Sequence, residues 1–298
     1  MKLKFFTFIL LGSISVSLNA ASFNCAKARV SLEKTICTDT QLNAVDEKMG
    51  NLYIQLRQSL GKTAVKQLRE TQRHWLKQRT KICSSEDSAC LLNFYYERIS
   101  ALKLRQCLNL QQVIDSATSG TVIQLEETTC RYTEALRITG KENLTIEGKG
   151  DVWIIVDDIN DDVIKIQNSQ RVFLKNIKAR HQTPLEGFNC EGSVVSMFNS
   201  QQIWLTRCEL NGSGSVGVHA DASSEIVVNQ CYIHHNTLAA FWLDDSDSIA
   251  IHNNTITENG STIYGLKAGN IRMTDNIIGN NKGEMGWSSP FSREIMEE

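Results

Sequence analysis

A repeat of about 23 residues constrains this chain more than any other feature of its sequence. Each of four segments begins with isoleucine and continues with mostly aliphatic and polar residues. A turn that contains cysteine or asparagine follows, and leucine or isoleucine ends the segment. They are IWLTRCEL at Ile203, IVVNQCYI at Ile226, IAIHNNTI at Ile249 and IRMTDNII at Ile271, at intervals of 23, 23 and 22 residues. Looser members begin at Leu144 and Val172. A period of this length with short β-branched strands predicts stacked coils.

Stacking places equivalent residues in ladders along the coils, about 4.8 Å apart. One such column contains Cys208, Cys231, Asn254 and Asn276. Asparagine suits a turn position with left-handed dihedrals and can hydrogen-bond along its ladder. Cysteine is small enough for the same place, and neighbouring coils bring Cys208 and Cys231 within disulfide range. The column therefore predicts either a disulfide between these two residues or two stacked thiols.

The pattern resembles the right-handed parallel β-helix of pectate-lyase-like and NosD-like proteins, with its NNTI-type repeats, from about Leu110 to Asn281. The resemblance implies a right-handed parallel β-helix of about six coils. We expect a short capping helix and the first strands between Val113 and Gly148. Open β-edges invite aggregation, so the tail after Gly283 is expected to cover the last coil. That tail contains Trp287, Pro290, Phe291 and Ile295.

The first part of the chain has helical periodicity instead. After Asp39, which can cap a helix, apolar residues recur at steps of three and four from Leu42 until Gly61. Two further helices are predicted over 65–82 and 91–102. Short connections between them predict antiparallel helices that pack as neighbours. The first half is therefore expected to form a small α-helical domain.

Several motifs in this helical part agree in order and spacing with one known family. They are CAKARVSLEKTIC from Cys25, Leu42 with Asp46, then Tyr53, QRHWLKQRTKIC ending at Cys83, and CLLNFYYERISAL from Cys90. Together they resemble the LprI-type lysozyme-inhibitor family from Cys25 to about Leu102. The resemblance implies a small, secreted, disulfide-linked helical domain with a proposed role in blocking lysozyme. Among the matching positions, Trp75 is expected in the core, and Asp46, Arg79 and Arg98 in a buried polar network.

The cysteines and the first residues indicate export. Residues 1–20 contain two lysines, a short apolar run and a final alanine, the pattern of a cleaved signal peptide. Disulfides persist in oxidising compartments, so we expect a periplasmic or extracellular protein without a membrane anchor. The disulfide candidates are Cys25, Cys37, Cys83, Cys90, Cys107, Cys130, Cys208 and Cys231, of nine cysteines in all. Their pairing stays open, although Cys107 and Cys130 are expected to hold the cap of the solenoid.

Charge divides the chain at the same place as periodicity. Residues 21–105 carry 15 Lys and Arg against 8 Asp and Glu, whereas residues 106–298 carry 14 against 25. These opposite charges predict two domains, a helical one over 21–105 and a parallel β-helix with its cap and tail over 106–298. A basic helical face suits anionic envelope polymers better than a basic enzyme.

Several kinds of partner are disfavoured. The basic half lacks a nucleic-acid recognition motif, and the larger half is acidic. The cysteine and histidine spacings, including His234–His235, do not fit a zinc or copper site. The acidic run Asp157 to Asp162 lacks the spaced ligands and the glycine of a recognised calcium loop, so its use for calcium is left open. We expect no nucleic acid, no metal and no cofactor.

Polar and aromatic residues on the coils form the candidate glycan-binding set. These are Trp204, His219, Asp221, Trp242, Asp244 and Asp245. The repeat predicts that His219 lies near Trp242, and Asp221 near Asp244. An aromatic ring can cover the C–H face of a sugar while carboxylates accept its hydroxyl protons. Solvated strand ends with turn-forming aspartates are the alternative.

These features predict an exported envelope protein that binds lysozyme or another glycan-cleaving enzyme, or an envelope polysaccharide, without catalysis. Asp244 and Asp245 point to opposite faces of a strand unless a turn falls between them, and no nucleophile-and-base set is visible. The alternative is a carbohydrate-active enzyme, a polysaccharide hydrolase, lyase or epimerase acting on the β-helix face. A third reading is a spacer whose basic and acidic domains dock on each other.

Overall fold

The computed structural model describes residues 21–182, 192–283, 286–287 and 296–297. The predicted signal peptide, Cys190 and the tail residues Pro290, Phe291 and Ile295 lie outside the described residues, as does the side chain of Trp287. The chain forms two compact units: residues up to Asn51 with Arg73–Arg98, and Leu52–Gln72 with the residues from Ile99 onward. In the part that the structure describes, no helix is long and apolar enough to cross a membrane.

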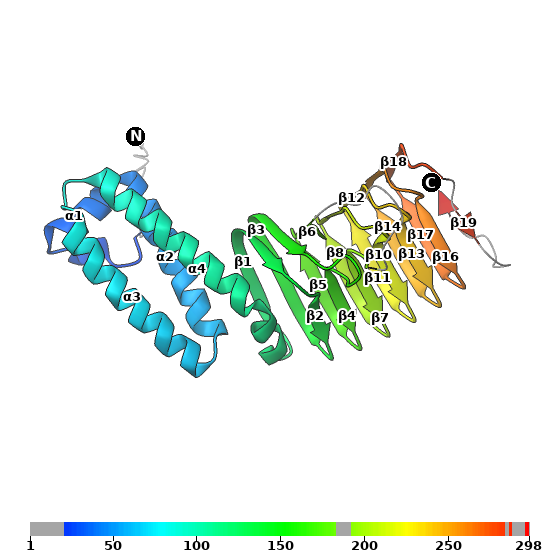
Figure 1. The fold of residues 1–298 in the computed structure, drawn as a ribbon, viewed down its shortest axis with the longest axis horizontal. Coiled ribbons are helices and arrows are strands. Elements are labelled where there is room, and N and C mark those ends of the chain that lie inside the picture. Colours follow the sequence, from blue (N-terminus) through cyan, green and yellow to red (C-terminus); the bar gives the residue numbers. More distant parts are fainter. Residues whose placement is uncertain (1–20, 183–191, 284–285, 288–295, 298) are drawn as a thin grey trace, which may run out of the picture. The chain divides into compact units, whose positions relative to one another are not determined.

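Helices form the chain as far as Ser116 (Figure 1). They are η1 (Cys25–Lys27), α1 (Ser31–Thr38), α2 (Thr40–Ser59), α3 (Lys62–Ile82) and α4 (Ser88–Ser116). Asp39 caps α2 as predicted, because its carboxylate accepts the backbone N–H groups of Gln41 and Leu42.

The last helix, α4, is longer than the sequence pattern predicts. The expected third helix and the expected capping helix are one continuous helix, because no glycine or proline interrupts it and buried leucines continue along it. The side-chain amide of Gln106, in its second half, donates to Gln124 O and accepts from the backbone N–H of Glu126 on the first strand. The end of α4 therefore closes the first coil of the solenoid.

Three disulfides are present among the described residues, all of them between candidate cysteines. They are Cys25–Cys37, Cys83–Cys90 and Cys107–Cys130. The third links α4 to the first strand, as predicted for the cap. Such bonds stabilise a small core by restricting the unfolded chain.

A buried polar network holds the first unit together. The hydroxyl of Tyr95 donates a hydrogen bond of 2.5 Å to Asp46 Oδ1 and accepts one from the Arg79 guanidinium. Burial, together with the negative charge of Asp46, raises the pKa of Tyr95 far above its usual range, so this hydroxyl stays protonated. Asp46 and Arg79 therefore belong to one network, as predicted, and Tyr95 connects them. Trp75 is buried beside them, as predicted.

Beyond α4 the chain consists of strands. We group them by the wall of the solenoid in which they lie. The first wall contains β2 (Leu136–Thr139), β4 (Ile164–Gln167), β7 (Val195–Phe198), β10 (Val216–Asp221), β13 (Ala239–Asp244), β16 (Ile263–Leu266) and β19 (Gly286–Trp287). The second contains β5 (Gln170–Lys175), β8 (Gln201–Thr206), β11 (Ser224–Asn229), β14 (Asp247–His252), β17 (Gly269–Thr274) and β20 (Met296–Glu297). The third contains β6 (Lys178–His181), β9 (Glu209–Asn211), β12 (Tyr232–His234), β15 (Thr255–Thr257) and β18 (Ile277–Gly279). The long strands β1 (Val122–Tyr132) and β3 (Glu142–Val156) pass through the second and third walls.

The strands stack in parallel, coil upon coil (Figure 1). The first wall is a seven-stranded sheet in the order β19-β16-β13-β10-β7-β4-β2. The second and third walls belong to one 13-stranded sheet, in the order β18-β15-β12-β9-β6-β3-β5-β8-β11-β14-β17-β20, with β1 beside β3. A coil such as β10, β11 and β12 adds one strand to each wall. The result is a parallel β-solenoid of about six coils, as predicted.

The repeat intervals correspond to the strand register. Ile203, Ile226, Ile249 and Ile271 pair in one column of the second wall, and each is at most 5% exposed. Inward columns of this kind form the core, because alternate residues of a strand face opposite sides. Corner residues instead adopt left-handed dihedrals, and many of them are asparagine.

Cys208 and Cys231 are buried free thiols, so their inclusion among the disulfide candidates was wrong. Each sulfur occupies the place of an asparagine amide in the ladder. Asn254 Oδ1 accepts the backbone N–H of Cys231, and its Nδ2 donates to Val228 O. In the same way Cys231 Sγ accepts the N–H of Cys208 and donates to Leu205 O. The two sulfurs are engaged with backbone groups, which is the second of the two predicted arrangements.

Candidate functional site

The outer face of the first wall presents two columns of side chains across β7, β10, β13 and β16. One column runs Ser196, His219, Trp242, Tyr264, and the next runs Phe198, Asp221, Asp244. The residues between the columns, such as Ala220 and Leu243, are buried in the core. The predicted proximity of His219 to Trp242, and of Asp221 to Asp244, is therefore confirmed by the strand register. We call these two columns the first-wall site.

The rings of the first column contact one another. The centroids of His219 and Trp242 are 5.3 Å apart at an angle of 37°, and those of Trp242 and Tyr264 are 5.4 Å apart at 73°. Offset and edge-on arrangements at these distances are favourable for aromatic rings. The column is therefore a continuous, partly exposed aromatic surface, with the two carboxylates along one side.

Two nitrogen atoms of this column lack a hydrogen-bond partner among the described residues: Nε2 of His219 and Nε1 of Trp242. Asp244 Oδ2 lies 4.0 Å from the histidine nitrogen, beyond hydrogen-bond reach. Buried polar atoms are normally paired. Both atoms are also shielded from solvent, so a ligand reaches them only if the rings move.

Two of the predicted candidates lie away from this site. Trp204 belongs to β8 in the second wall, where its ring stacks on Phe173 with centroids 4.5 Å apart and planes at 10°. Asp245 lies in the turn after β13 with a φ of 41°, and its carboxylate is 3.6 Å from Lys267 Nζ. A turn therefore separates Asp245 from Asp244. The repeat places residues in columns but does not show at which residue the chain passes from one wall to the next.

Sequence reasoning missed two members of the site. Tyr264 follows Trp242 by 22 residues, and Phe198 precedes Asp221 by 23 residues, so the repeat interval could have found both. The side chain of Phe198 is 47% exposed. It adds a second apolar surface beside the carboxylates.

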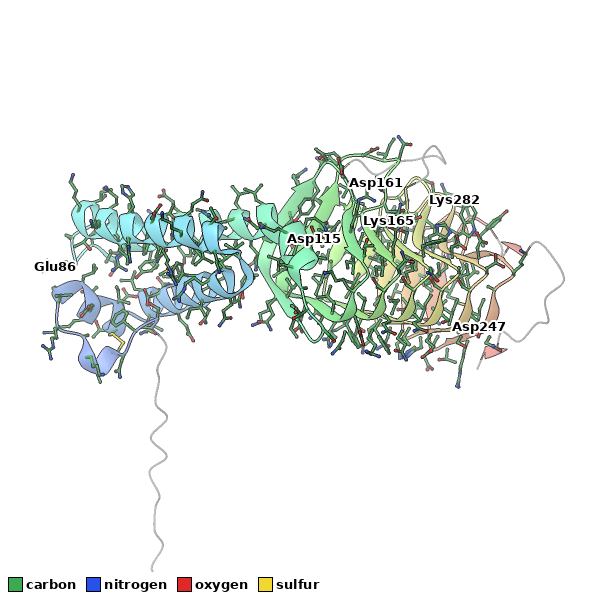
Figure 2. All side chains as sticks on the ribbon, turned by 90° about the horizontal axis from the view of Figure 1, so that it is seen from below. Glu86, Asp115, Asp161, Lys165, Asp247 and Lys282 are labelled. Atoms are coloured by element: carbon green, nitrogen blue, oxygen red, sulfur yellow. A yellow bond between two sulfur atoms is a disulfide. The ribbon has the colours of Figure 1, made fainter. Side chains whose placement is uncertain are left out.

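The acidic run after β3 has partners within the protein. Asp161 Oδ2 is 2.8 Å from Arg137 Nη2, and Asp162 accepts hydrogen bonds from Ser193 and Ser196 and lies 3.2 Å from Lys165 Nζ. Figure 2 shows Asp161 and Lys165 on the early coils. These contacts engage two of the four carboxylates of the run. Among the described residues, no group of three or more His, Cys, Asp or Glu side chains is arranged to hold a metal.

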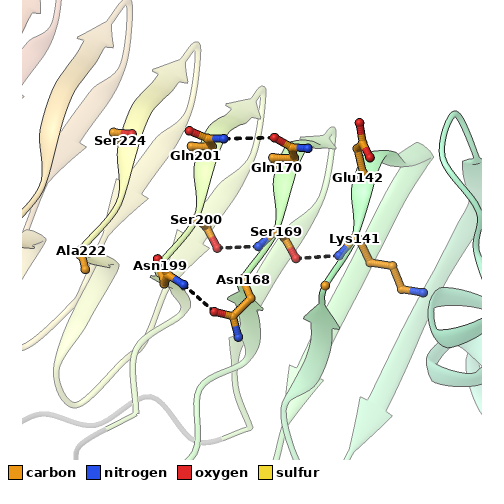
Figure 3. A pocket seen from close by; sticks show the side chains of 11 residues that line it. Lys141, Glu142, Asn168, Ser169, Gln170, Asn199, Ser200, Gln201, Ala222 and Ser224 are labelled. Carbon is orange, nitrogen blue, oxygen red and sulfur yellow. Dashed lines mark hydrogen bonds between the residues drawn. The ribbon is translucent and has the colours of Figure 1, made fainter.

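A polar hollow of about 500 Å³ lies at the corner between the first and second walls, one residue beyond the second column (Figure 3). Asn199 Nδ2 donates to Asn168 Oδ1 at 2.7 Å along one side, and Gln201 Nε2 donates to Gln170 Oε1 at 3.0 Å along the other. Buried Ser169 and Ser200 lie between these two ladders. The hollow adjoins the first-wall site, because Phe198 in the second column directly precedes Asn199 in the lining of the hollow.

Comparison with known structures finds distant likenesses. A candidate glycosyl hydrolase from Parabacteroides merdae is 12% identical, with a TM-score of 0.48, over 58% of this chain and 88% of that chain. An alginate lyase from Paenibacillus is 13% identical, with a TM-score of 0.45, over 57% and 73%. The A-module of a mannuronan C-5 epimerase from Azotobacter vinelandii is 10% identical, with a TM-score of 0.31, over 65% and 95%. No match is found among curated proteins.

Family models match both parts of the chain. Residues 25–102 match the model for lysozyme inhibitor LprI. Residues 136–289, more than half of the chain, match the model for the right-handed beta helix region. The chain therefore belongs to the right-handed β-helix family, and its helical segment is similar to the lysozyme inhibitor LprI.

Proposed function

We propose that the first-wall site binds a cell-envelope glycan without cleaving it. The observation that carries this proposal is the aromatic column of His219, Trp242 and Tyr264 directly beside the carboxylates of Asp221 and Asp244. The rings offer an apolar surface for the C–H face of a sugar, and the carboxylates accept its hydroxyl protons.

The charge of the site favours a neutral or amino-sugar glycan over a polyuronate. Asp221 and Asp244 are neighbours, and Asp245 follows in the turn. The ammonium group of Lys267 lies 3.6 Å from the carboxylate of Asp245, not beside Asp221 or Asp244 in the strand register. A chain of sugar carboxylates would meet like charges here, and like charges in contact oppose binding.

Replacing Trp242 with alanine is expected to weaken binding of chitin oligosaccharides, a neutral amino-sugar probe, by about 30-fold. Truncation of a central tryptophan in a binding surface typically costs about 2 kcal/mol. Isothermal titration calorimetry on the intact protein measures this effect. Trp204→Ala is the matched control, since its ring lies on the second wall, and it should bind like the wild type. Equal losses in the two variants would contradict the proposed location.

We propose that the helical segment provides the second contact, with lysozyme or another glycan-cleaving enzyme. The match of residues 25–102 to the LprI family supports this. The intact protein, at equimolar concentration, is expected to slow the clearing of a cell-wall suspension by lysozyme. Clearing at an unchanged rate at saturating protein would contradict this part of the proposal.

The disulfides fit a protein exported to the periplasm or beyond, since oxidising compartments preserve such bonds.

Glycan cleavage is the second candidate, and one observation favours it. Asp221 and Asp244 are cross-strand neighbours, and His219 Nε2 is 4.0 Å from Asp244 Oδ2. Adjacent strands bring carboxylates to roughly the 5 Å separation used by retaining glycosidases. If this candidate holds, incubation with chitin oligosaccharides will release reducing ends, and Asp244→Asn will abolish the release. Binding without any release supports the non-catalytic proposal.

A further inference from the structure

A second cluster of titratable side chains lies on the third wall, away from the first-wall site. Its members are Glu209 on β9, Tyr232 and His234 on β12, His235 after β12, and Glu258 after β15. The Nδ1 atoms of His234 and His235 are 2.7 Å apart. One ring must therefore donate a proton and the other accept it, because two Nδ1–H groups or two lone pairs would repel each other at this distance.

The opposite nitrogens of both rings face carboxylates. Nε2 of His234 is 3.5 Å from Glu209 Oε1, and Nε2 of His235 is 3.2 Å from Glu258 Oε2. Tyr232 stacks on the His234 ring with centroids 3.8 Å apart, which fixes the orientation of that ring. Histidines that bind metals commonly direct one nitrogen to the metal and donate the other N–H to a carboxylate. His235 has that arrangement, whereas Nε2 of His234 faces Glu209 without forming a hydrogen bond among the described residues.

We propose that the Nδ1 atoms of His234 and His235 form a binding site for a divalent transition metal, with Cu²⁺ as the preferred ion. The metal displaces the proton from the Nδ1 that donates it, and that proton is carried instead by Nε2 of the same ring, next to its glutamate. Metal–nitrogen bonds of about 2.0 Å at a right angle place the two nitrogens about 2.8 Å apart, whereas tetrahedral coordination requires about 3.3 Å. The observed separation is closer to the tetragonal geometry of Cu²⁺.

The surroundings suit a bound cation that exchanges with solvent. The side chain of His235 is 55% exposed, so the ion can reach the pair. Glu209 and Glu258 supply negative charge on both sides, and Lys178 holds the other oxygen of Glu209 at 3.1 Å. With two protein nitrogens, the remaining positions on the metal are left for water.

The sequence alone disfavoured such a site because the histidine spacing does not fit zinc or copper. Adjacent residues of a strand also normally point to opposite faces. His235 escapes that rule, since it follows the end of β12 with a φ of 54°. This left-handed corner conformation turns its ring back toward His234. The site therefore depends on the corner of the coil, which the residue spacing does not reveal.

Titration of the intact, chelator-treated protein with Cu²⁺ tests the proposal, with calorimetry for affinity and electron paramagnetic resonance for the ligands. We expect one Cu²⁺ with coupling to two nitrogens, and His235→Gln should lower its affinity at least about 100-fold. Glu258→Gln is expected to weaken it about 10-fold through the lost support of the ring. His252→Gln changes a histidine on the second wall and should leave the affinity unchanged. Wild-type affinity in His235→Gln, or a loss in His252→Gln, would overturn the site.

Discussion

Asn254→Leu is expected to destabilise the solenoid by about 3–5 kcal/mol. Asn254 is 1% exposed, and its amide serves three groups. It accepts from Cys231 N at 2.8 Å and donates to Val228 O at 2.9 Å and to Asn276 Oδ1 at 3.0 Å. Leucine is similar in length but leaves the buried N–H and carbonyl groups unpaired, at about 1–3 kcal/mol each. Urea unfolding followed by far-ultraviolet circular dichroism measures the change.

The ladder itself offers a matched control for this prediction. Cysteine already fills the equivalent place at Cys231, where the sulfur accepts one backbone N–H and donates to a carbonyl. Asn254→Cys should therefore cost clearly less than Asn254→Leu, since it keeps a weak donor and acceptor. If the two variants lose equal stability, the ladder acts through packing alone and the hydrogen-bond account is wrong.

Asp46→Ala is expected to destabilise the helical domain by about 3–5 kcal/mol. The change removes the carboxylate that faces the Tyr95 hydroxyl and, through it, the Arg79 guanidinium, which is 9% exposed. Breaking a buried charge network by removing one member leaves the opposite charge desolvated and uncompensated. The loss is measured from the helical signal at 222 nm during chemical unfolding.

Two further variants separate charge from packing in this network. Glu47→Ala changes the exposed neighbour of Asp46 and should have little effect on the free energy of unfolding. The double variant Asp46→Ala with Arg79→Met removes both charges, so it should be less destabilised than the sum of the two single variants. Additive losses would show that Asp46 and Arg79 are not coupled through Tyr95.

The solenoid was predictable because the repeat encodes register directly. Intervals of 22 and 23 residues are enough to put Ile226 above Ile203, and Trp242 beside His219. Strand alternation then decides which residues face the core. The capping of α2 by Asp39 was equally local, since one side chain and the next two backbone N–H groups suffice.

Features that depend on the corners of the coil could not be predicted in this way. Trp204 and Trp242 both face outward, but the period does not show that a corner places them on different walls. Asp245 and His235 owe their positions to left-handed dihedrals at corners, which non-glycine residues adopt only when the surrounding structure imposes them.

The continuity of α4 was missed for another reason. Two separate helical patterns, one on each side of residue 105, proved to share one uninterrupted helix.

Oxidative footprinting of Trp242 and Trp204 in the intact protein tests the proposed glycan site most directly. Both indole rings belong to the same chain, so each serves as the internal reference for the other. With saturating chitin oligosaccharide, we predict that oxidation of Trp242 slows while oxidation of Trp204 continues at the rate of the free protein. Protection of Trp204 alone, or protection of neither ring at saturation, would contradict glycan binding at the first-wall site.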